Sequence, residues 1–91
     1  MTQIYLDNAA TTTLLDEVID AMVVVMKNNF GNPSSTHTLG QEAKTILEET
    51  RRKIAHELHV SPAEIIYTSC GTEANNLILK SAVEDLKIER I

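Results

Sequence analysis

The residues best suited to chemistry lie in one short stretch, TSCGTEANN, at residues 68–76. It contains hydroxyl side chains, the single cysteine and a glycine, and it follows the apolar run EIIY. A strand, a tight turn and a helix N-terminus would gather free backbone N–H groups around one point, where the helix dipole favours an anion such as phosphate. Gly71 allows close backbone approach, and Thr72 can add a hydroxyl hydrogen bond. The alternative is that Ser69 or Thr72 simply caps the helix.

Cys70 lies inside the same stretch and raises the possibility of a nucleophile. A thiol near a helix N-terminus can have a lowered pKa, because the dipole favours the thiolate. A phosphate bound beside it would oppose that ionisation. We therefore interpret Cys70 as a small packing residue, and we expect no catalytic residue among residues 1–91.

The histidines indicate no metal site. HELH, at residues 56–59, resembles a zinc-protease signature, but that signature needs two histidines four residues apart on one helix face. Here they are three apart, and no third ligand is suggested nearby. His37, beside the NPSS turn, is the one histidine that we link to an active site.

Hydrophobic spacing predicts the elements that would position these groups. A first helix follows Thr12 or Thr13, either of which can cap it, with Asp16 and Glu17 in its first turn. The turn-forming residues of NNFGNPSST (28–36) predict a loop. A long helix spans about Thr38 to Leu58, with its charged residues, including Arg51, mostly facing water.

The second half of the chain predicts an incomplete α/β domain. EIIYTS (64–69) is typical of a buried strand, a helix follows Gly71, and the final KIERI resembles the start of another strand. QIYL (3–6) favours a short extended segment. A single complete strand cannot form a sheet, and helices cover both faces of parallel sheets. We therefore expect the opening part of a larger α/β protein.

Composition excludes several classes of partner. Ninety-one residues form at most one domain, and 8 Lys and Arg against 13 Asp and Glu give a net charge of −5. That balance argues against nucleic acid as a partner. The N-terminus lacks a signal-peptide pattern, and the apolar run AMVVVM is far shorter than the ~20 residues that span a bilayer. A single cysteine fits a reducing compartment, so we expect a cytoplasmic protein with no membrane partner.

Three motifs resemble the N-terminal motifs of cysteine desulfurases. They are IYLDNAATT (4–12), FGNPSSTH (30–37) followed by Gly40, and TSCGTEANN, in that family's order and spacing. Cysteine desulfurases are pyridoxal-phosphate enzymes of the class V aminotransferase family, with the aspartate-aminotransferase fold (fold type I). The resemblance implies that residues 1–12 lie near the active-site mouth and that residues 13–91 begin the large cofactor-binding domain, mostly helical with one clear strand.

The resemblance also implies roles for individual residues. Gly71 and Thr72 match the turn that binds the phosphate of pyridoxal 5'-phosphate, Asn8 matches a segment near the substrate, and His37 lies in a loop near the active site and the dimer contact. The family's Schiff-base lysine, its acidic partner of the pyridine nitrogen and its sulfur-accepting cysteine all match positions beyond residue 91. We interpret the chain's own lysines as solvated residues of helices: Lys27, Lys44, Lys53, Lys80 and Lys87.

The implied function is that of a cysteine desulfurase, which transfers sulfur from L-cysteine to an enzyme cysteine as a persulfide and releases alanine. The family further implies a homodimer and sulfur-acceptor proteins as partners, and we expect residues 1–91 alone to be inactive. Two alternatives stay open. One is another class V enzyme, such as an aminotransferase, a selenocysteine lyase or an epimerase. The other is a non-enzymatic module with a vestigial anion-binding turn.

Overall fold

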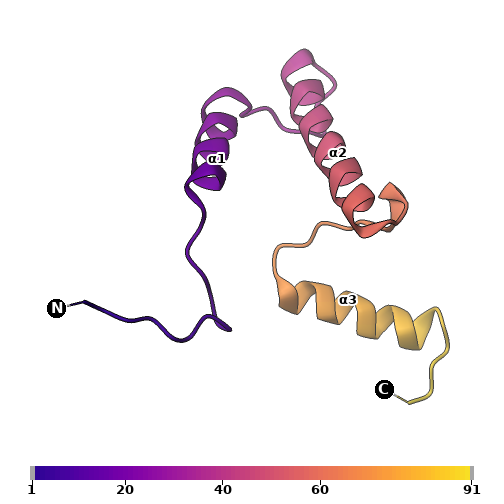
Figure 1. Ribbon diagram of the computed structural model, residues 1–91. Helices are drawn as coiled ribbons and strands as arrows, with labels where there is room; N and C mark the ends of the chain where they lie inside the picture. The colour runs from indigo at the N-terminus through magenta and orange to yellow at the C-terminus, as the bar shows by residue number, and fades with distance from the viewer. Residues whose placement is uncertain (1, 91) are drawn as a thin grey trace. The chain divides into compact units, whose positions relative to one another are not determined.

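The computed structural model describes residues 2–90, which form three α-helices and one short 3-10 helix (Figure 1). Their bounds are α1 Asp16–Asn28, α2 Thr38–Leu58, η1 Pro62–Glu64 and α3 Gly71–Glu84. The predicted bounds of the long helix α2 are confirmed, and α3 begins at the predicted glycine.

The predicted cap of α1 is wrong. Leu15, in an extended conformation, precedes the helix and forms no side-chain capping hydrogen bond. Asp16 and Glu17 do occupy the first turn, where their charges suit the helix dipole. The start of α1 therefore depends on charge and on the apolar spacing behind it, and the threonine hydroxyls lie too early in the chain to cap it.

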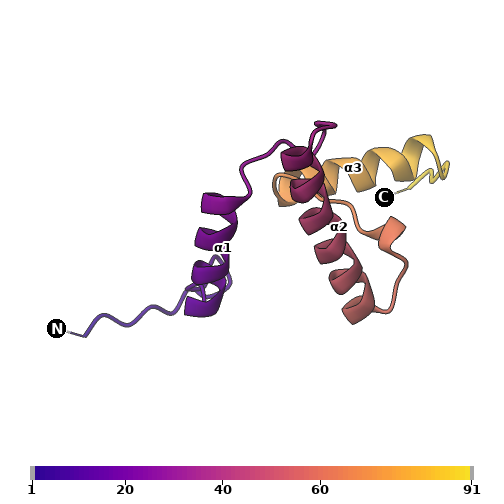
Figure 2. The same cartoon turned by 90° about the horizontal axis from the view of Figure 1, so that it is seen from above.

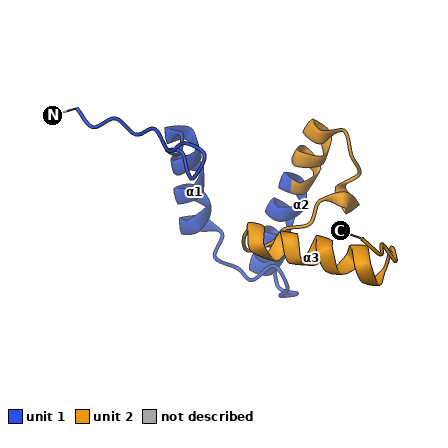
Figure 3. Ribbon diagram, turned by 90° about the horizontal axis from the view of Figure 1, so that it is seen from below, with its two compact units in different colours: residues 1–50 blue, residues 51–91 orange. Residues whose placement is uncertain are grey.

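The chain divides within α2 into two compact units, residues 1–50 and residues 51–91 (Figure 3). The first unit contains α1, the following loop and the beginning of α2. The second contains the end of α2, η1 and α3, and therefore the turn that leads into α3.

The loop between α1 and α2 is closed by its own polar groups. Ser34 N donates to Oδ1 of Asn32 at 2.9 Å, and Ser35 N donates to the carbonyl of Asn32, also at 2.9 Å. Gly40 is buried beneath this turn, where an added Cβ would lie 2.7 Å from the Asn32 carbonyl oxygen. The loop therefore needs a glycine there because the backbone itself occupies the space.

The predicted strand over residues 64–69 is wrong for the described chain. Ser61 begins η1 with a capping box, since its own N–H donates to Oε2 of Glu64 at 2.7 Å, and Glu64 ends that turn. From Ile65 (φ −94°, ψ 114°) the backbone is extended, but residues 2–90 contain no strand ladder. Ile66 is 67% exposed rather than buried. A strand needs a partner backbone and cover for its side chains, and the described residues supply neither.

The two other extended segments also form no strand. Residues 3–6 and 87–90 lie outside regular structure, and Ile91 lies outside the described residues. Lys87 has φ 55°, in the left-handed region, which is incompatible with a strand. The β-α-β unit predicted from the sequence is therefore absent from residues 2–90.

Few apolar side chains are buried. Within residues 2–90 only Ala43 (7% exposed) and Ala55 (1%) count as buried hydrophobic residues, and both lie on α2. The apolar faces of α1 and α3 stay exposed, with no buried residue on either helix. None of the helices described here is both long and apolar enough to cross a membrane.

Candidate cofactor-binding site

The turn before α3 leaves its backbone donors at an open end of the helix. Cys70 precedes the helix in extended conformation (φ −166°, ψ 171°), and the first helical hydrogen bond runs from Ala74 N to the Cys70 carbonyl at 3.2 Å. The N–H groups of Gly71, Thr72 and Glu73 therefore come before the helical ladder. A Cβ added at Gly71 would meet no atom within 4 Å. Gly71, Thr72 and Glu73 at this end are exposed, and Figure 2 shows α3 from above.

The exposed thiol of Cys70 lies against these donors. The backbone N–H of Glu73, then the Ser69 hydroxyl and the backbone N–H of Thr72, hold the pKa of Cys70 below that of an ordinary thiol. The Ser69 Oγ to Cys70 Sγ distance is 3.7 Å, although the thiol forms no regular capping hydrogen bond. The turn therefore favours a negative charge at the position predicted for an anion.

A second negative group is held at the outer side of the turn. Ser69 donates from its backbone N–H and from its hydroxyl to Oε2 of Glu73, at 2.7 and 2.5 Å. Those bonds, the hydroxyl first, hold the pKa of Glu73 below its usual range. Ser69 thus acts as a donor to Glu73 and is not the cap of α3. Its hydroxyl is engaged, whereas Gly71 and Thr72 remain toward the open end.

The donor set of this turn fits a phosphate group. A phosphate needs several N–H and O–H donors that converge on a point a backbone can approach closely, with a helix N-terminus behind it. The N–H groups of Gly71 and Thr72 lie before the helical ladder of α3, Thr72 carries a hydroxyl, and the space at Gly71 is free, so the donors are of the kinds that a phosphate needs.

Arg51 on α2 holds the segment that leads into the turn. Its Nη1 donates to the carbonyl of Ile65, and its guanidinium lies 4.6 Å from the centre of the Tyr67 ring. Farther along, the Thr68 hydroxyl donates to the Cys70 carbonyl at 3.2 Å. Arg51 is partly buried and is an exception among the charged residues of α2, most of which are exposed as predicted. A tyrosine in a chain with only three aromatic residues was the signal that could have indicated this cation–π contact.

Asn8 and His37 belong to the first unit and Gly71 and Thr72 to the second. Asn8 lies in an exposed turn that is closed by Ala10 N donating to the Asp7 carbonyl at 3.1 Å. His37 precedes α2, and its Nδ1 accepts the N–H of Gly40 at 3.4 Å. His37 thus has a capping position at α2, and its proposed place near an active site stays a prediction.

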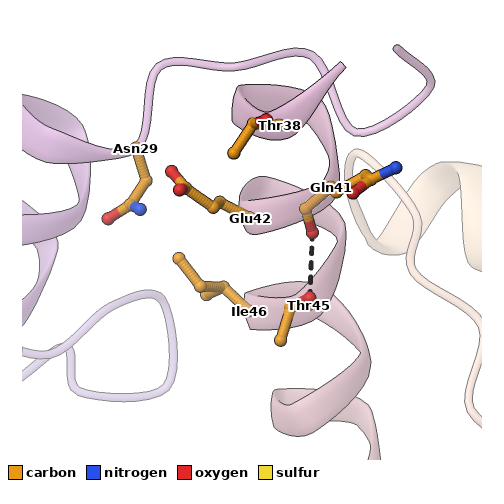
Figure 4. A pocket seen from close by; sticks show the side chains of 6 residues that line it. All are labelled: Asn29, Thr38, Gln41, Glu42, Thr45 and Ile46. Carbon is orange, nitrogen blue, oxygen red and sulfur yellow. Dashed lines mark hydrogen bonds between the residues drawn. The ribbon is translucent and has the colours of Figure 1, made fainter. Parts of the chain in front are cut away.

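A hollow of the first unit lies elsewhere, between Asn29 and the start of α2. It has a volume of about 460 Å³ and is lined by Asn29, Thr38, Gln41, Glu42, Thr45 and Ile46. Figure 4 shows the Glu42 side chain extending toward Asn29, and Thr45 Oγ1 donating to the Gln41 carbonyl at 2.9 Å. None of the residues predicted for the site lines it. Residues 2–90 also contain no group of three or more His, Cys, Asp or Glu residues placed to hold a metal ion.

Residues 4–90 match the family model described as aminotransferase class-V. The chain belongs to the class V aminotransferase family. The family's enzymes depend in general on pyridoxal phosphate, which agrees with the prediction of an anion-binding turn at Gly71 and Thr72.

Known relatives within the family include two kinds of enzyme. The chain is 51% identical over 78 residues to the cysteine desulfurase IscS of Dictyoglomus turgidum. The matched region is 86% of this chain and 20% of that protein. It is 43% identical over 82 residues to the selenocysteine lyase of Bos taurus, covering 90% of this chain and 19% of that protein. The chain therefore spans about a fifth of the length of these relatives.

A solved structure has the same backbone arrangement. A NifS-like protein superposes with a TM-score of 0.88 at 44% sequence identity, over 94% of this chain and 24% of that chain. The predicted relation to the fold type I enzymes is thereby supported, and the strand expected in residues 64–69 is the part of the fold prediction that fails for the described residues.

Proposed function

We propose that this chain forms the N-terminal portion of a cysteine desulfurase. In the reaction, the bond between carbon and sulfur of L-cysteine breaks, the sulfur passes to the thiol of an enzyme cysteine as a persulfide, and alanine leaves. The observation that carries the proposal is the uncapped start of α3 at residues 70–73, in a chain of this family that is 51% identical to a cysteine desulfurase over 86% of this chain.

Gly71 and Thr72 would hold the phosphate of pyridoxal 5'-phosphate through their backbone N–H groups and the Thr72 hydroxyl. When bound, the cofactor supplies the electron sink that weakens bonds at the substrate's α-carbon. The role of this chain would be to bind the cofactor's phosphate and so to fix the position of the cofactor. Residues 13–91 would begin the cofactor-binding domain, and residues 1–12, with Asn8, would lie near the pocket mouth, as would His37.

The remaining chemistry would come from outside residues 1–91. We place the cofactor-binding lysine and the sulfur-accepting cysteine there, so residues 1–91 alone should be inactive. The working enzyme would be a cytoplasmic homodimer that passes sulfur to acceptor proteins. Cys70, whose thiol faces the phosphate donors, is not assigned a catalytic role.

A titration of the 91-residue chain tests the anchor directly. Pyridoxal phosphate and inorganic phosphate should shift the amide NMR signals of Gly71 and Thr72, whereas pyridoxal without phosphate should leave them unchanged. Thr72→Ala should weaken the response, and Thr68→Val is a matched control that removes a hydroxyl outside the donor set. Equal responses to pyridoxal and pyridoxal phosphate would contradict the phosphate anchor.

A labelling experiment tests the absence of a cofactor lysine. Borohydride reduction of the chain with pyridoxal phosphate, followed by peptide mapping, should show no label or scattered label over the five lysines. Stoichiometric label on one lysine would show that the chain carries its own cofactor lysine.

A selenocysteine lyase is the second candidate, because the bovine enzyme of that name is 43% identical over 90% of this chain. The two candidates differ in the substrate atom that leaves. Release of alanine from L-cysteine and from L-selenocysteine by the complete enzyme, measured side by side, separates them. A clear preference for selenocysteine would replace the first proposal, and the phosphate anchor would stand in both.

A further inference from the structure

Ser69, just before the start of α3, holds a carboxylate that belongs to the helix itself. It donates its backbone N–H and its hydroxyl to Oε2 of Glu73, at 2.7 and 2.5 Å. Glu73 lies in the first turn of α3 and is exposed. Within residues 2–90 its carboxylate accepts no hydrogen bond from any other residue. The position of this carboxylate therefore depends on Ser69.

The same two residue types are arranged differently at the start of η1. There Ser61 and Glu64 form a regular capping box: the Ser61 N–H donates to Oε2 of Glu64 at 2.7 Å, and Ser61 Oγ accepts the N–H of Ala63 at 3.4 Å. At α3, the Ser69 hydroxyl donates to Glu73 instead of accepting from the helix, and the helix has no side-chain cap. The bonds between Ser69 and Glu73 therefore keep both side chains off the N–H donors of α3.

A carboxylate released from Ser69 would be drawn to those donors. The N–H groups of Gly71, Thr72 and Glu73 come before the helical ladder. Together with the helix dipole they favour a negative charge, and a glutamate in the first turn is well placed to supply it. The bonds from Ser69, the hydroxyl first, hold the pKa of Glu73 below its usual range, so the group is charged at neutral pH. The chain thus carries its own competitor for the anion position.

We propose that Ser69 is a positioning residue that holds the Glu73 carboxylate away from the donors of the phosphate anchor. With the carboxylate restrained, the N–H groups of Gly71 and Thr72 are available to an incoming phosphate. The inference rests on the proposed function, because it takes Gly71 and Thr72 as the anchor. Family membership is a separate reason to expect such an anion, since class V enzymes depend in general on pyridoxal phosphate.

A different role for the same bonds would be to stiffen the turn, because Ser69 and Glu73 enclose residues 70–72. The two roles predict opposite results when the Glu73 side chain is removed. If the bonds stiffen the turn, Glu73→Ala weakens phosphate binding as much as Ser69→Ala does. If Ser69 restrains a competitor, Glu73→Ala leaves binding at full strength, because the competitor is gone.

Amide exchange in the 91-residue chain without ligand tests the restraint. Ser69→Ala should slow exchange at Thr72 by about tenfold, which corresponds to a freed carboxylate that accepts this N–H in about nine-tenths of the molecules. Combining Ser69→Ala with Glu73→Gln should restore the rate of the unsubstituted chain, because the helix dipole does not favour a neutral amide as it favours a carboxylate. Unchanged or faster exchange at Thr72 in Ser69→Ala would overturn the proposal.

Titration of the same proteins with inorganic phosphate measures the consequence for binding, read from the Thr72 amide signal. Ser69→Ala should raise the dissociation constant about tenfold, since the donors are then free in only about a tenth of the molecules. The double variant should recover most of the affinity, and Glu73→Ala should bind at least as tightly as the unsubstituted chain. Thr68→Val is the control, because it removes a neighbouring hydroxyl that donates to the Cys70 carbonyl.

The restraint and the phosphate anchor can fail separately. Equal weakening by Ser69→Ala and Glu73→Ala, without recovery in the double variant, would overturn the restraint in favour of a stiffening role. A phosphate response that Ser69→Ala leaves unchanged would also overturn it and would keep the anchor. Slower exchange at Thr72 in Ser69→Ala, with no response to phosphate in any variant, would support the restraint while contradicting the anchor of the proposed function.

Discussion

Two turns of this chain contain glycines, and the glycines have opposite surroundings. Where the first loop meets α2, a Cβ on Gly31 in the loop would collide with the backbone of Leu39, and one on Gly40 in the first turn of α2 would collide with the backbone of Asn32 and Ser35. In the turn before α3, a Cβ on Gly71 would meet nothing. In the first loop, the backbone N–H groups of Ser34 and Ser35 donate to Asn32 within the loop itself. The second leaves the N–H groups of Gly71 and Thr72 before the helical ladder of α3, with free space at its glycine. The first is therefore a structural turn, and the second has the room that the proposed phosphate anchor requires.

Substitution of Gly40 and substitution of Gly71 should therefore have unequal effects. Gly40→Ala should lower the local stability of the α2 start by about 3 kcal/mol, because the atoms in the way are backbone and cannot rotate aside. Gly71→Ala should leave the start of α3 unchanged or slightly firmer. Amide exchange of each first helical turn measures both effects. Comparable losses at the two positions would contradict the contrast.

The next effect concerns the cofactor in the complete enzyme. Thr72→Ala should raise the dissociation constant of pyridoxal phosphate by about ten- to a hundredfold, because a hydrogen bond to a charged group contributes roughly 1.5–3 kcal/mol. Cys70→Ser keeps the size of the side chain and should retain both cofactor and turnover. Cofactor release and sulfide production are measured for both variants. If Cys70→Ser abolishes sulfur transfer while Thr72→Ala keeps its cofactor, the turn is a nucleophile site instead.

The sequence was sufficient where local chemistry decides the outcome. The span of α2 follows from its apolar spacing, and the start of α3 at Gly71 from small residues before a helical pattern. The three motifs identified the family, which the match over residues 4–90 confirms.

Prediction from the sequence failed where the structure depends on contacts between residues that are distant in the chain. Residues 65–68 have the composition of a strand, but a strand forms only against another backbone, and residues 2–90 contain none for them. The contact of Arg51 with Tyr67 joins residues 16 apart, which no local pattern encodes. Neither the substrate nor the position of Asn8 and His37 relative to the turn follows from local spacing.

Arg51 connects the open turn to the rest of its unit, and removing its guanidinium should loosen that turn. Arg51→Met loses the hydrogen bond to the Ile65 carbonyl and the contact with the Tyr67 ring, at about 1–2 kcal/mol together. Amide exchange of Ile65, whose N–H donates to the Pro62 carbonyl at 3.2 Å, should speed up by about tenfold or somewhat more. Arg52→Met, at an exposed neighbour, is the matched control and should change little. Equal effects of the two variants would show that the contact does not hold the segment.

The smallest effect tests whether the second turn is an anion site at all. The N–H of Glu73, the Ser69 hydroxyl and the N–H of Thr72 lower the pKa of Cys70, so the thiolate forms at lower pH than in an ordinary cysteine. Alkylation of Cys70 should accordingly remain fast at a pH where a free thiol has slowed. Ser69→Ala removes one of these donors and frees the Glu73 carboxylate, so both changes should move the alkylation profile to higher pH. Thr68→Val is the control, since the Thr68 hydroxyl donates to the Cys70 carbonyl.

Pyridoxal phosphate should also move the pH profile of Cys70 alkylation to higher pH. Its phosphate would take the N–H of Thr72 from the thiol and add a negative charge beside it, and both effects oppose the thiolate. Pyridoxal lacks that charge and should leave the profile unchanged. If neither compound moves it while Ser69→Ala does, the donors at α3 serve the thiol and not a phosphate. The contrast between a closed turn and a ligand-binding turn would then become one between a closed turn and a reactive cysteine.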